Sequence, residues 1–180
     1  TPENRISRNS EHLKEAIMSF GDVIVKPMDG MGGNSIFKTS KNDKNLNVIL
    51  ETVTQNNTRT TMVQRYIKEI SAGDKRILMI NGEPVPYALA RIPSDQDFRG
   101  NLAKGGTGKG VPLSDTDYKI CQLIGPSLKS MGIVFAGIDV IGEHLTEINV
   151  TSPTCIRELD ALYDLNIAGQ LFDYLDNSKA

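Results

Sequence analysis

The chain has 180 residues, of which 39% are hydrophobic, and its 20 basic and 22 acidic residues give a formal net charge of -2. This length can bury one sizeable core, and charges scattered along the chain leave no block that would bind nucleic acid or a membrane surface. No apolar run reaches the roughly 18 residues of a membrane span and no signal-peptide pattern is present, so we expect a cytoplasmic protein.

The first residue is Thr rather than Met, and the opening TPENRISRNSEHLKEAI runs from a polar approach into an amphipathic helix. We expect a fragment of a longer chain; a processed or an engineered terminus would give the same pattern. The cysteines, Cys121 and Cys155, form neither a CxxC motif nor a metal-spaced pair, which is typical of a reduced cellular setting. With His12 and His144 as the only histidines, no Ser-His or Cys-His constellation is present, which argues against a hydrolytic triad.

The first third of the chain alternates short apolar runs with one helical pattern. The run DVIVKP (22–27) and the run SIFKT (35–39) read as strands on either side of the glycine-rich DGMGGN. Apolar residues then recur at helical spacing in 43–55, and TTMVQRYI (60–67) reads as a further strand. We therefore expect strand, glycine loop, strand, helix and strand in this order.

Asn81-Gly82 separates KRILMI (75–80) from PVPYALARI (84–92), and Asn-Gly is the strongest short signal for a hairpin because both turn positions need a positive φ. The segment 93–110 holds five glycines and almost no apolar anchor, so we expect it to be a mobile loop.

The last third of the chain predicts two helices around two strands. Ser114 and Asp117 have the spacing of a capping box, and a helix follows whose buried stripe is Ile120, Ile124, Leu128 and Met131. Two strands, 133–141 and 144–150, come next, and a helix with an interruption at 166–169 spans about 155–176. Helices on a largely antiparallel sheet give an α+β fold.

The segment LTEINVTSPT (145–154) places Glu147 and Asn149 on one face of a strand, because side chains alternate between faces. A two-residue turn before it would mix polar and apolar residues on both faces. We therefore expect a three-residue loop, 142–144, which pairs Asp139 with Glu147 and Gly137 with Asn149. Two carboxylates and an amide oxygen then gather, and a hard cation such as Mg²⁺ would relieve their repulsion. A surface strand edge bonded to lysine or arginine is an equally acceptable reading.

Several further residues are candidates for binding an anionic ligand. The loop after Lys26 matches neither a Walker A motif nor GxGxxG, yet a glycine hairpin can present backbone N–H groups to a phosphate; a plain loop is the alternative. Arg76 and Arg91 lie in apolar strands, where an unpaired charge is costly to bury, although both could point to solvent. Arg99 and Asn101 lie in the glycine-rich segment, which could close over a reaction.

Taken together, VIVKPMDGMGGNSIF, GDKRILMINGEPVPYALARIP, RGNLAKGGTG and GIDVIGEHLTEINVTSPTCIRE resemble the carboxy-terminal, ATP-binding part of bacterial glutathione synthetases, which are ATP-grasp ligases. The resemblance runs along nearly all of the chain. It implies an ATP-grasp fold with a smaller lobe at about 20–70 and a larger lobe at about 71–180, which enclose the nucleotide. It also implies that ATP drives the joining of γ-glutamylcysteine and glycine into glutathione, through an acyl-phosphate of the dipeptide, and that the protein forms a homo-oligomer.

The same resemblance assigns the site residues. Mg²⁺, with Mn²⁺ as an alternative, would be bound by Asp139, Glu147 and Asn149. The nucleotide would be bound by Lys26, Asp29, Gly30, Met31, Gly32, Gly33, Gln64, Tyr66, Ile67 and Asp74, of which Asp74 would reach the ribose. The transferred phosphoryl group would be neutralised by Arg76 and Arg91, and a flexible active-site loop would hold Arg99 and Asn101. The peptide carboxylate would be bound by Ser152, Pro153 and Thr154.

One feature departs from the family. Its members carry an additional amino-terminal domain with part of the dipeptide site, and the sequence contains no counterpart of it. Two other functions therefore stay open: an ATP-grasp ligase with other substrates, such as one that adds glutamate to a peptide, and a nucleotide-binding module without ligation.

Overall fold

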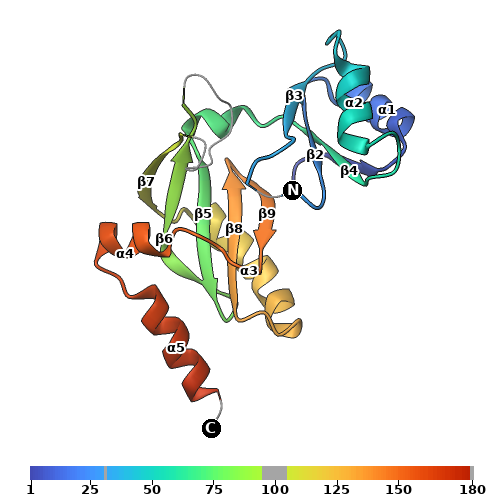
Figure 1. The fold of residues 1–180 in the computed structure, drawn as a ribbon. Helices are drawn as coiled ribbons and strands as arrows, with labels where there is room; N and C mark the ends of the chain where they lie inside the picture. Colours follow the sequence, from blue (N-terminus) through green and yellow to red (C-terminus); the bar gives the residue numbers. More distant parts are fainter. Residues whose placement is uncertain (31, 95–104, 179–180) are drawn as a thin grey trace. The chain divides into compact units, whose positions relative to one another are not determined.

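The structure is a computed structural model that describes residues 1–30, 32–94 and 105–178. The chain forms two compact units, Thr1–Lys68 and Glu69–Ala180, and each contains one sheet and its covering helices (Figure 1). Every strand pair in both sheets is antiparallel, which confirms the α+β prediction. In the described part of the chain, no helix combines the length and the apolar character needed to cross a membrane.

The first unit packs two helices on one face of a four-stranded sheet with the order β1-β4-β2-β3. The strands are β1 (Asn4–Ser7), β2 (Val23–Pro27), β3 (Phe37–Thr39) and β4 (Thr61–Arg65), and the helices are α1 (Ser10–Phe20) and α2 (Leu46–Thr54). Alternate strand residues, Val23, Val25 and Val63, are fully buried against the two helices. The opposite face of this sheet therefore carries Ile24 and Lys26 of β2 and Gln64 of β4.

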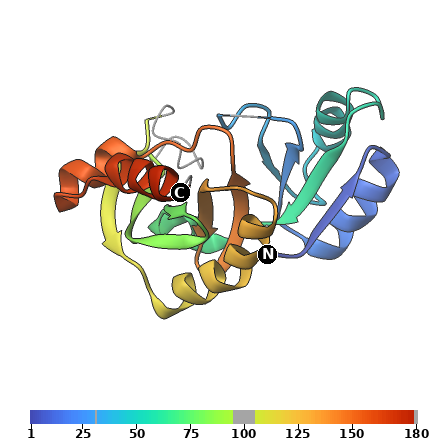
Figure 2. The ribbon, with the colours of Figure 1, turned by 90° about the horizontal axis from the view of Figure 1, so that it is seen from below.

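The second unit is built on a five-stranded sheet with the order β7-β6-β5-β8-β9. A short 3₁₀ helix, η1 (Lys68–Ala72), leads into the strands β5 (Asp74–Ile80), β6 (Glu83–Ile92), β7 (Thr107–Pro112), β8 (Phe135–Ile141) and β9 (His144–Asn149). The helices are α3 (Asp115–Ser130), α4 (Ile156–Tyr163) and α5 (Ile167–Asn177). Helix α3 lies on one side of the sheet and α4 and α5 lie on the other (Figure 2).

The two faces of this sheet carry different chemistry. On the α3 side, Ile77, Ala88 and Ile138 form a continuous apolar core with Cys121 and Leu128 of the helix. On the other side, an apolar core of Leu78, Leu89, Cys155, Leu159 and Ile167 covers only part of the face. The rest of that face holds Asp74, Arg76, Arg91 and Asp139, which occupy the alternate positions of the same strands.

Three predictions about the second unit are wrong. Residues 107–110, expected in a loop, belong to β7. Glycine is needed at position 110, because a Cβ there would lie 2.6 Å from a ring carbon of Tyr163. Met131 is not part of the buried stripe of α3, because it caps the end of the helix with 62% of its surface exposed. The interrupted last helix is two helices, and the break comes slightly earlier than expected, at Asp164, which takes a left-handed backbone conformation.

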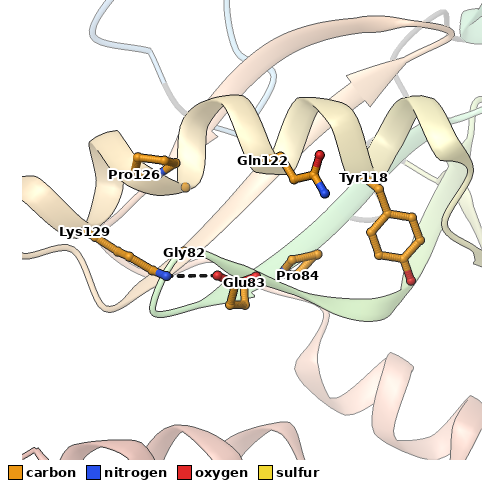
Figure 3. Close-up of a pocket in the computed structure, with 8 residues that line it drawn as sticks. Gly82, Glu83, Pro84, Tyr118, Gln122, Pro126 and Lys129 are labelled. Atoms are coloured by element: carbon orange, nitrogen blue, oxygen red, sulfur yellow. Dashed lines mark hydrogen bonds and ion pairs between the residues drawn. The ribbon is translucent and has the colours of Figure 1, made fainter.

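The predicted Asn81-Gly82 turn is confirmed, with φ of 47° and 72°, and it also forms a close contact with α3. A Cβ on Gly125 would lie 2.4 Å from the carbonyl oxygen of Gly82, so the helix and the turn touch through their backbones. Beside this contact, Glu83, Pro84, Tyr118, Gln122 and Lys129 line a hollow of about 330 Å³, which the ion pair of Lys129 with Glu83 borders (Figure 3).

Replacing Gly125 with alanine is expected to lower the free energy of unfolding by about 1–3 kcal/mol, because the methyl group pushes α3 away from the turn. Glycine-to-alanine changes inside helices normally raise stability by about 0.5–1 kcal/mol. Here the contact with Gly82 makes the same change destabilising. Urea unfolding followed by tyrosine circular dichroism measures the effect. Ser127→Ala, at an exposed position of the same helix, is the control and should change stability by about 0.5 kcal/mol or less.

Candidate functional site

The β8–β9 hairpin pairs Asp139 with Glu147 and Gly137 with Asn149, as predicted. The predicted three-residue loop is wrong, because a two-residue turn pairs Ile141 with His144. The two-residue turn is compatible with the predicted Asp139–Glu147 pairing because a β-bulge at Thr146 follows the turn. In the bulge, Thr146 Oγ1 donates to the Asp139 carbonyl oxygen at 3.1 Å. The bulge shifts the pairing by one residue and so sets Glu147 and Asn149 on the polar face.

Arg76 and Arg91 converge on the Asp139 carboxylate. Arg76 lies directly opposite Asp139 in the sheet and donates through Nε to Oδ1 at 2.5 Å and through Nη2 to Oδ2 at 3.0 Å. Arg91 reaches the same Oδ2 through Nη2 at 2.8 Å. These three residues are only 3–6% exposed, so the possibility that the arginines point to solvent is excluded. Two arginine charges are thus buried against one shared carboxylate.

Asp74 extends this cluster. It lies opposite Arg91 in the β5–β6 pair, and Arg91 Nη2 donates to Asp74 Oδ2 at 2.5 Å. Burial, followed by the negative charge of Asp139, raises the pKa of Asp74 to about 7, although Arg91 and Arg76 oppose the shift. Burial also acts to lower the pKa of Arg91, but the carboxylates of Asp74 and Asp139 outweigh it and raise that pKa. Cations and carboxylates thus alternate along the cluster.

This face carries residue types that bind magnesium. Asp139, Glu147 and Asn149 have the oxygen donors that Mg²⁺ prefers; Glu147 is exposed and available to a ligand, whereas both oxygens of Asp139 accept from Arg76 and Arg91. Within the described ranges, no three His, Cys, Asp or Glu side chains form a metal site by themselves, so Asn149 and oxygens from a bound ligand or water would complete the shell. Asp74 Oδ1 and Asn149 Nδ2 are buried without a hydrogen-bond partner in the described chain, which indicates that this face is arranged to receive a polar ligand.

The segment after β9 lies beside the same cluster. Pro153 is buried against Gly137, while Ser152 and Thr154 are exposed, and Thr154 Oγ1 accepts from Arg76 Nη1 at 3.5 Å. The structure therefore brings Thr154 to the arginine and carboxylate cluster. Cys155, next in the chain, is buried, and burial raises the pKa of its thiol, as expected for an inert packing cysteine.

The first unit carries a separate set of predicted residues. Lys26 and the buried Gln64 lie on the sheet face opposite the helices, and Ile24 of the same face pairs with both Gln64 and Lys38. The Lys38 ammonium lies 3.9 Å from the centre of the Tyr66 ring, a cation–π contact, and Ile67 next to it is buried. Lys38 was not among the predicted residues, since only its strand pairing places it on this face.

The glycine loop follows β2. Gly32 and Gly33 have φ of 64° and 74°, which suits their glycine identity, and Asp29 is bound by Arg59 at 2.7 Å. Arg59 was also not predicted, and no sequence signal links residues that lie 30 positions apart. Three predicted site residues, Met31, Arg99 and Asn101, lie outside the described residues.

Comparison with known proteins agrees with these features. A family model described as the ATP-grasp domain of prokaryotic glutathione synthetase matches residues 1–164. The chain is 55% identical over 176 residues to a glutathione synthetase of Shewanella oneidensis and 54% identical over 179 residues to one of Xanthomonas campestris pv. campestris. These matches cover 98% and 99% of the chain but 56% and 57% of the relatives, so the chain spans a little over half of their length.

A solved structure of the ATP-grasp ligase PsnB, complexed with a minimal precursor, Mg and ADP, superposes with a TM-score of 0.69 at 17% identity, over 98% of the chain and 52% of PsnB. That likeness shows the ATP-grasp fold. Because the family model covers most of the sequence, the chain belongs to the family of prokaryotic glutathione synthetases and carries their ATP-grasp domain.

Proposed function

We propose that this chain is the ATP-binding part of an enzyme that joins γ-glutamylcysteine and glycine into glutathione, with cleavage of ATP to ADP and phosphate. The observation that carries the proposal is the identity of about 55% to glutathione synthetases along 98% of the chain. The polar face of the second unit supports it, because buried arginines beside the oxygen donors Asp139, Glu147 and Asn149 suit the transfer of a phosphoryl group.

The residues of the second unit supply positive charge and position rather than a nucleophile. Transfer of a phosphoryl group to a carboxylate brings two anions together, and Arg76 and Arg91 neutralise that charge from fixed, buried positions. Asp139, Glu147 and Asn149 would hold magnesium, which supplies further positive charge to the nucleotide phosphates when bound. The exposed Thr154 and Ser152, with Pro153, would bind the peptide carboxylate, and Thr154 already contacts Arg76.

The residues of the first unit would bind the nucleotide. Lys26 supplies a point charge to the phosphates, and Asp29, Gly30, Met31, Gly32 and Gly33 form a loop that offers backbone N–H groups to them. Gln64, Tyr66 and Ile67 would contact the adenine. From the second unit, Asp74 would reach the ribose, while its Oδ2 accepts from Arg91.

We also propose that the protein is cytoplasmic and forms a homo-oligomer, and that Arg99 and Asn101 belong to a loop that keeps water from the acyl-phosphate. Mn²⁺ would serve in place of magnesium, since it takes similar oxygen ligands.

The full-length protein is expected to release ADP only when γ-glutamylcysteine and glycine are both present, because the acyl-phosphate must be captured by the amine. A coupled assay for ADP, with each substrate omitted in turn, measures this. ADP release that is indifferent to glycine, or that needs glutamate instead, would contradict the proposal. Magnesium-dependent ATP binding without turnover on any amine would favour a nucleotide-binding module.

A further inference from the structure

The connection between α2 and β4, residues 55–60, lies against the first turn of the glycine loop, which we define as Met28–Gly30. The backbone N–H of Met28 donates to the Thr60 carbonyl oxygen at 3.2 Å, which continues the pairing of Pro27 with Thr61 beyond the ends of both strands. Arg59 Nε donates to Asp29 Oδ1 at 2.7 Å, and Arg59 Nη2 lies 2.7 Å from the same oxygen in an ion pair. The connection thus holds this turn through one backbone and two side-chain contacts.

The connection itself is firmly anchored. The Thr54 carbonyl oxygen accepts from the backbone N–H groups of Thr58 at 2.9 Å and Arg59 at 2.7 Å, and the hydroxyl group of Thr61 is within 3.4 Å of the Arg59 carbonyl oxygen. Thr54 and Thr61 are both fully buried. Because these bonds fix the backbone of Arg59, its guanidinium group reaches Asp29 from a rigid base.

This connection also has an unusual backbone. Gln55, Asn56 and Asn57 take left-handed conformations in succession, with φ of 49°, 56° and 67°. Asn57 Oδ1 accepts from the backbone N–H of Ser10 at 2.6 Å and so joins the connection to α1. Such conformations cost free energy for residues other than glycine, so the surrounding contacts must hold the segment in place.

The carboxylate of Asp29 needs a positively charged partner such as Arg59. Its side chain is 69% exposed and it precedes the glycines that we propose bind phosphate, so its charge would repel a polyphosphate at close range. The hydrogen bond from Arg59 lowers the pKa of Asp29, which keeps the carboxylate ionised and paired. The two residues border a polar hollow of about 500 Å³, which Met28, Gln55, Thr58 and Thr60 complete.

We propose that Arg59 is a positioning residue that fixes the first turn of the glycine loop and neutralises Asp29, so that the loop can bind the nucleotide phosphates. Arg59 touches Asp29 rather than the reacting atoms, and its effect reaches the nucleotide through the loop. This inference rests on the proposed binding of ATP by the first unit.

The test compares the affinities of the full-length protein for Mg-ATP, Mg-ADP and adenosine by calorimetry or by competition with a fluorescent nucleotide. Arg59→Ala is expected to weaken ATP and ADP about three- to fivefold, as suits an exposed ion pair, and to leave adenosine unchanged. Arg59→Lys keeps the charge and should recover part of the loss. Adding Asp29→Asn to Arg59→Ala should also recover part, because it removes the unpaired carboxylate.

Arg65→Ala is the matched control, because it breaks a comparably exposed ion pair, with Glu3 at 2.5 Å, in the same unit but away from the glycine loop. It should leave the ratio of ATP to adenosine affinity unchanged. The inference is overturned if Arg59→Ala binds ATP as tightly as the wild type, or if it weakens ATP and adenosine by the same factor. Failure of the wild type to bind ATP would instead overturn the proposed function, and this inference with it.

Discussion

Replacing Asp139 with alanine is expected to lower the free energy of unfolding by about 3–5 kcal/mol, because the change leaves buried arginine charge without its carboxylate. Arg76 would lose both of its bonds to Asp139 and, among its hydrogen bonds to described residues, keep the long one to Thr154. Arg91 would keep its hydrogen bond to Asp74. The loss therefore falls mainly on Arg76, which is only 6% exposed.

Two further variants separate the charge from the packing. Asp139→Asn keeps one acceptor oxygen and should cost less than Asp139→Ala. The double variant Arg76→Met with Asp139→Leu replaces both charges by apolar groups and should recover much of the lost stability, since apolar pairs of similar size often equal buried ion pairs.

Urea unfolding followed by near-ultraviolet circular dichroism suits this measurement, since four of the five tyrosines, Tyr87, Tyr118, Tyr163 and Tyr174, lie in the second unit. If Asp139→Ala unfolds within about 1 kcal/mol of the wild type, the buried cluster described above does not exist in solution.

The pairing of Asp139 with Glu147 could be predicted from the sequence because alternation of polar and apolar residues limits the register of a hairpin. The turn could not be predicted, because strict alternation puts Leu145 on the same face as Glu147, whereas the bulge at Thr146 interrupts the alternation and places Leu145 in the core under α3. The three-residue loop follows from assuming alternation without a bulge.

The ion pairs of the site were beyond the reach of the sequence for a different reason. Arg76 and Arg91 could be marked as cations in apolar strands, but their shared partner depends on the strand order β6-β5-β8, which brings residues 63 positions apart into contact. The pair of Lys75 with Asp117, on the opposite face, arises in the same way, since it joins β5 to the capping box of α3. A sequence pattern predicts which face of the sheet a side chain occupies, whereas its ion-pair partner depends on the order of the strands.

Strands at the sheet edges were the other difficulty. The sequence of β1 predicts a polar approach to a helix, because this edge strand has mostly exposed residues and no buried alternation, with Ile6 48% exposed. The glycines of β7 predict a loop because glycine normally weakens a strand, yet Gly110 is required there by the Tyr163 ring, which stacks on Tyr87. In both strands, neighbours distant in sequence outweigh local preference.

Glu147→Gln is expected to reduce the rate of ADP release about a hundredfold or more while leaving the fold intact. Glu147 is exposed and has no ion pair among the described residues, so the amide is tolerated structurally. Loss of its negative charge would weaken the proposed magnesium site, whose stabilisation of transferred charge amounts to several kcal/mol, and each 1.4 kcal/mol changes a rate about tenfold.

The matched control is Glu143→Gln, which makes the same chemical change at an exposed residue in the two-residue turn of the same hairpin. Both variants should unfold at the urea concentration of the wild type, and only Glu147→Gln should lose activity. Raising the magnesium concentration should restore part of the lost rate, because the remaining ligands, Asp139 and Asn149, still bind the ion weakly. Equal activity in the two variants would exclude Glu147 as a metal ligand, and unfolding of Glu147→Gln alone would show that its carboxylate stabilises the hairpin instead.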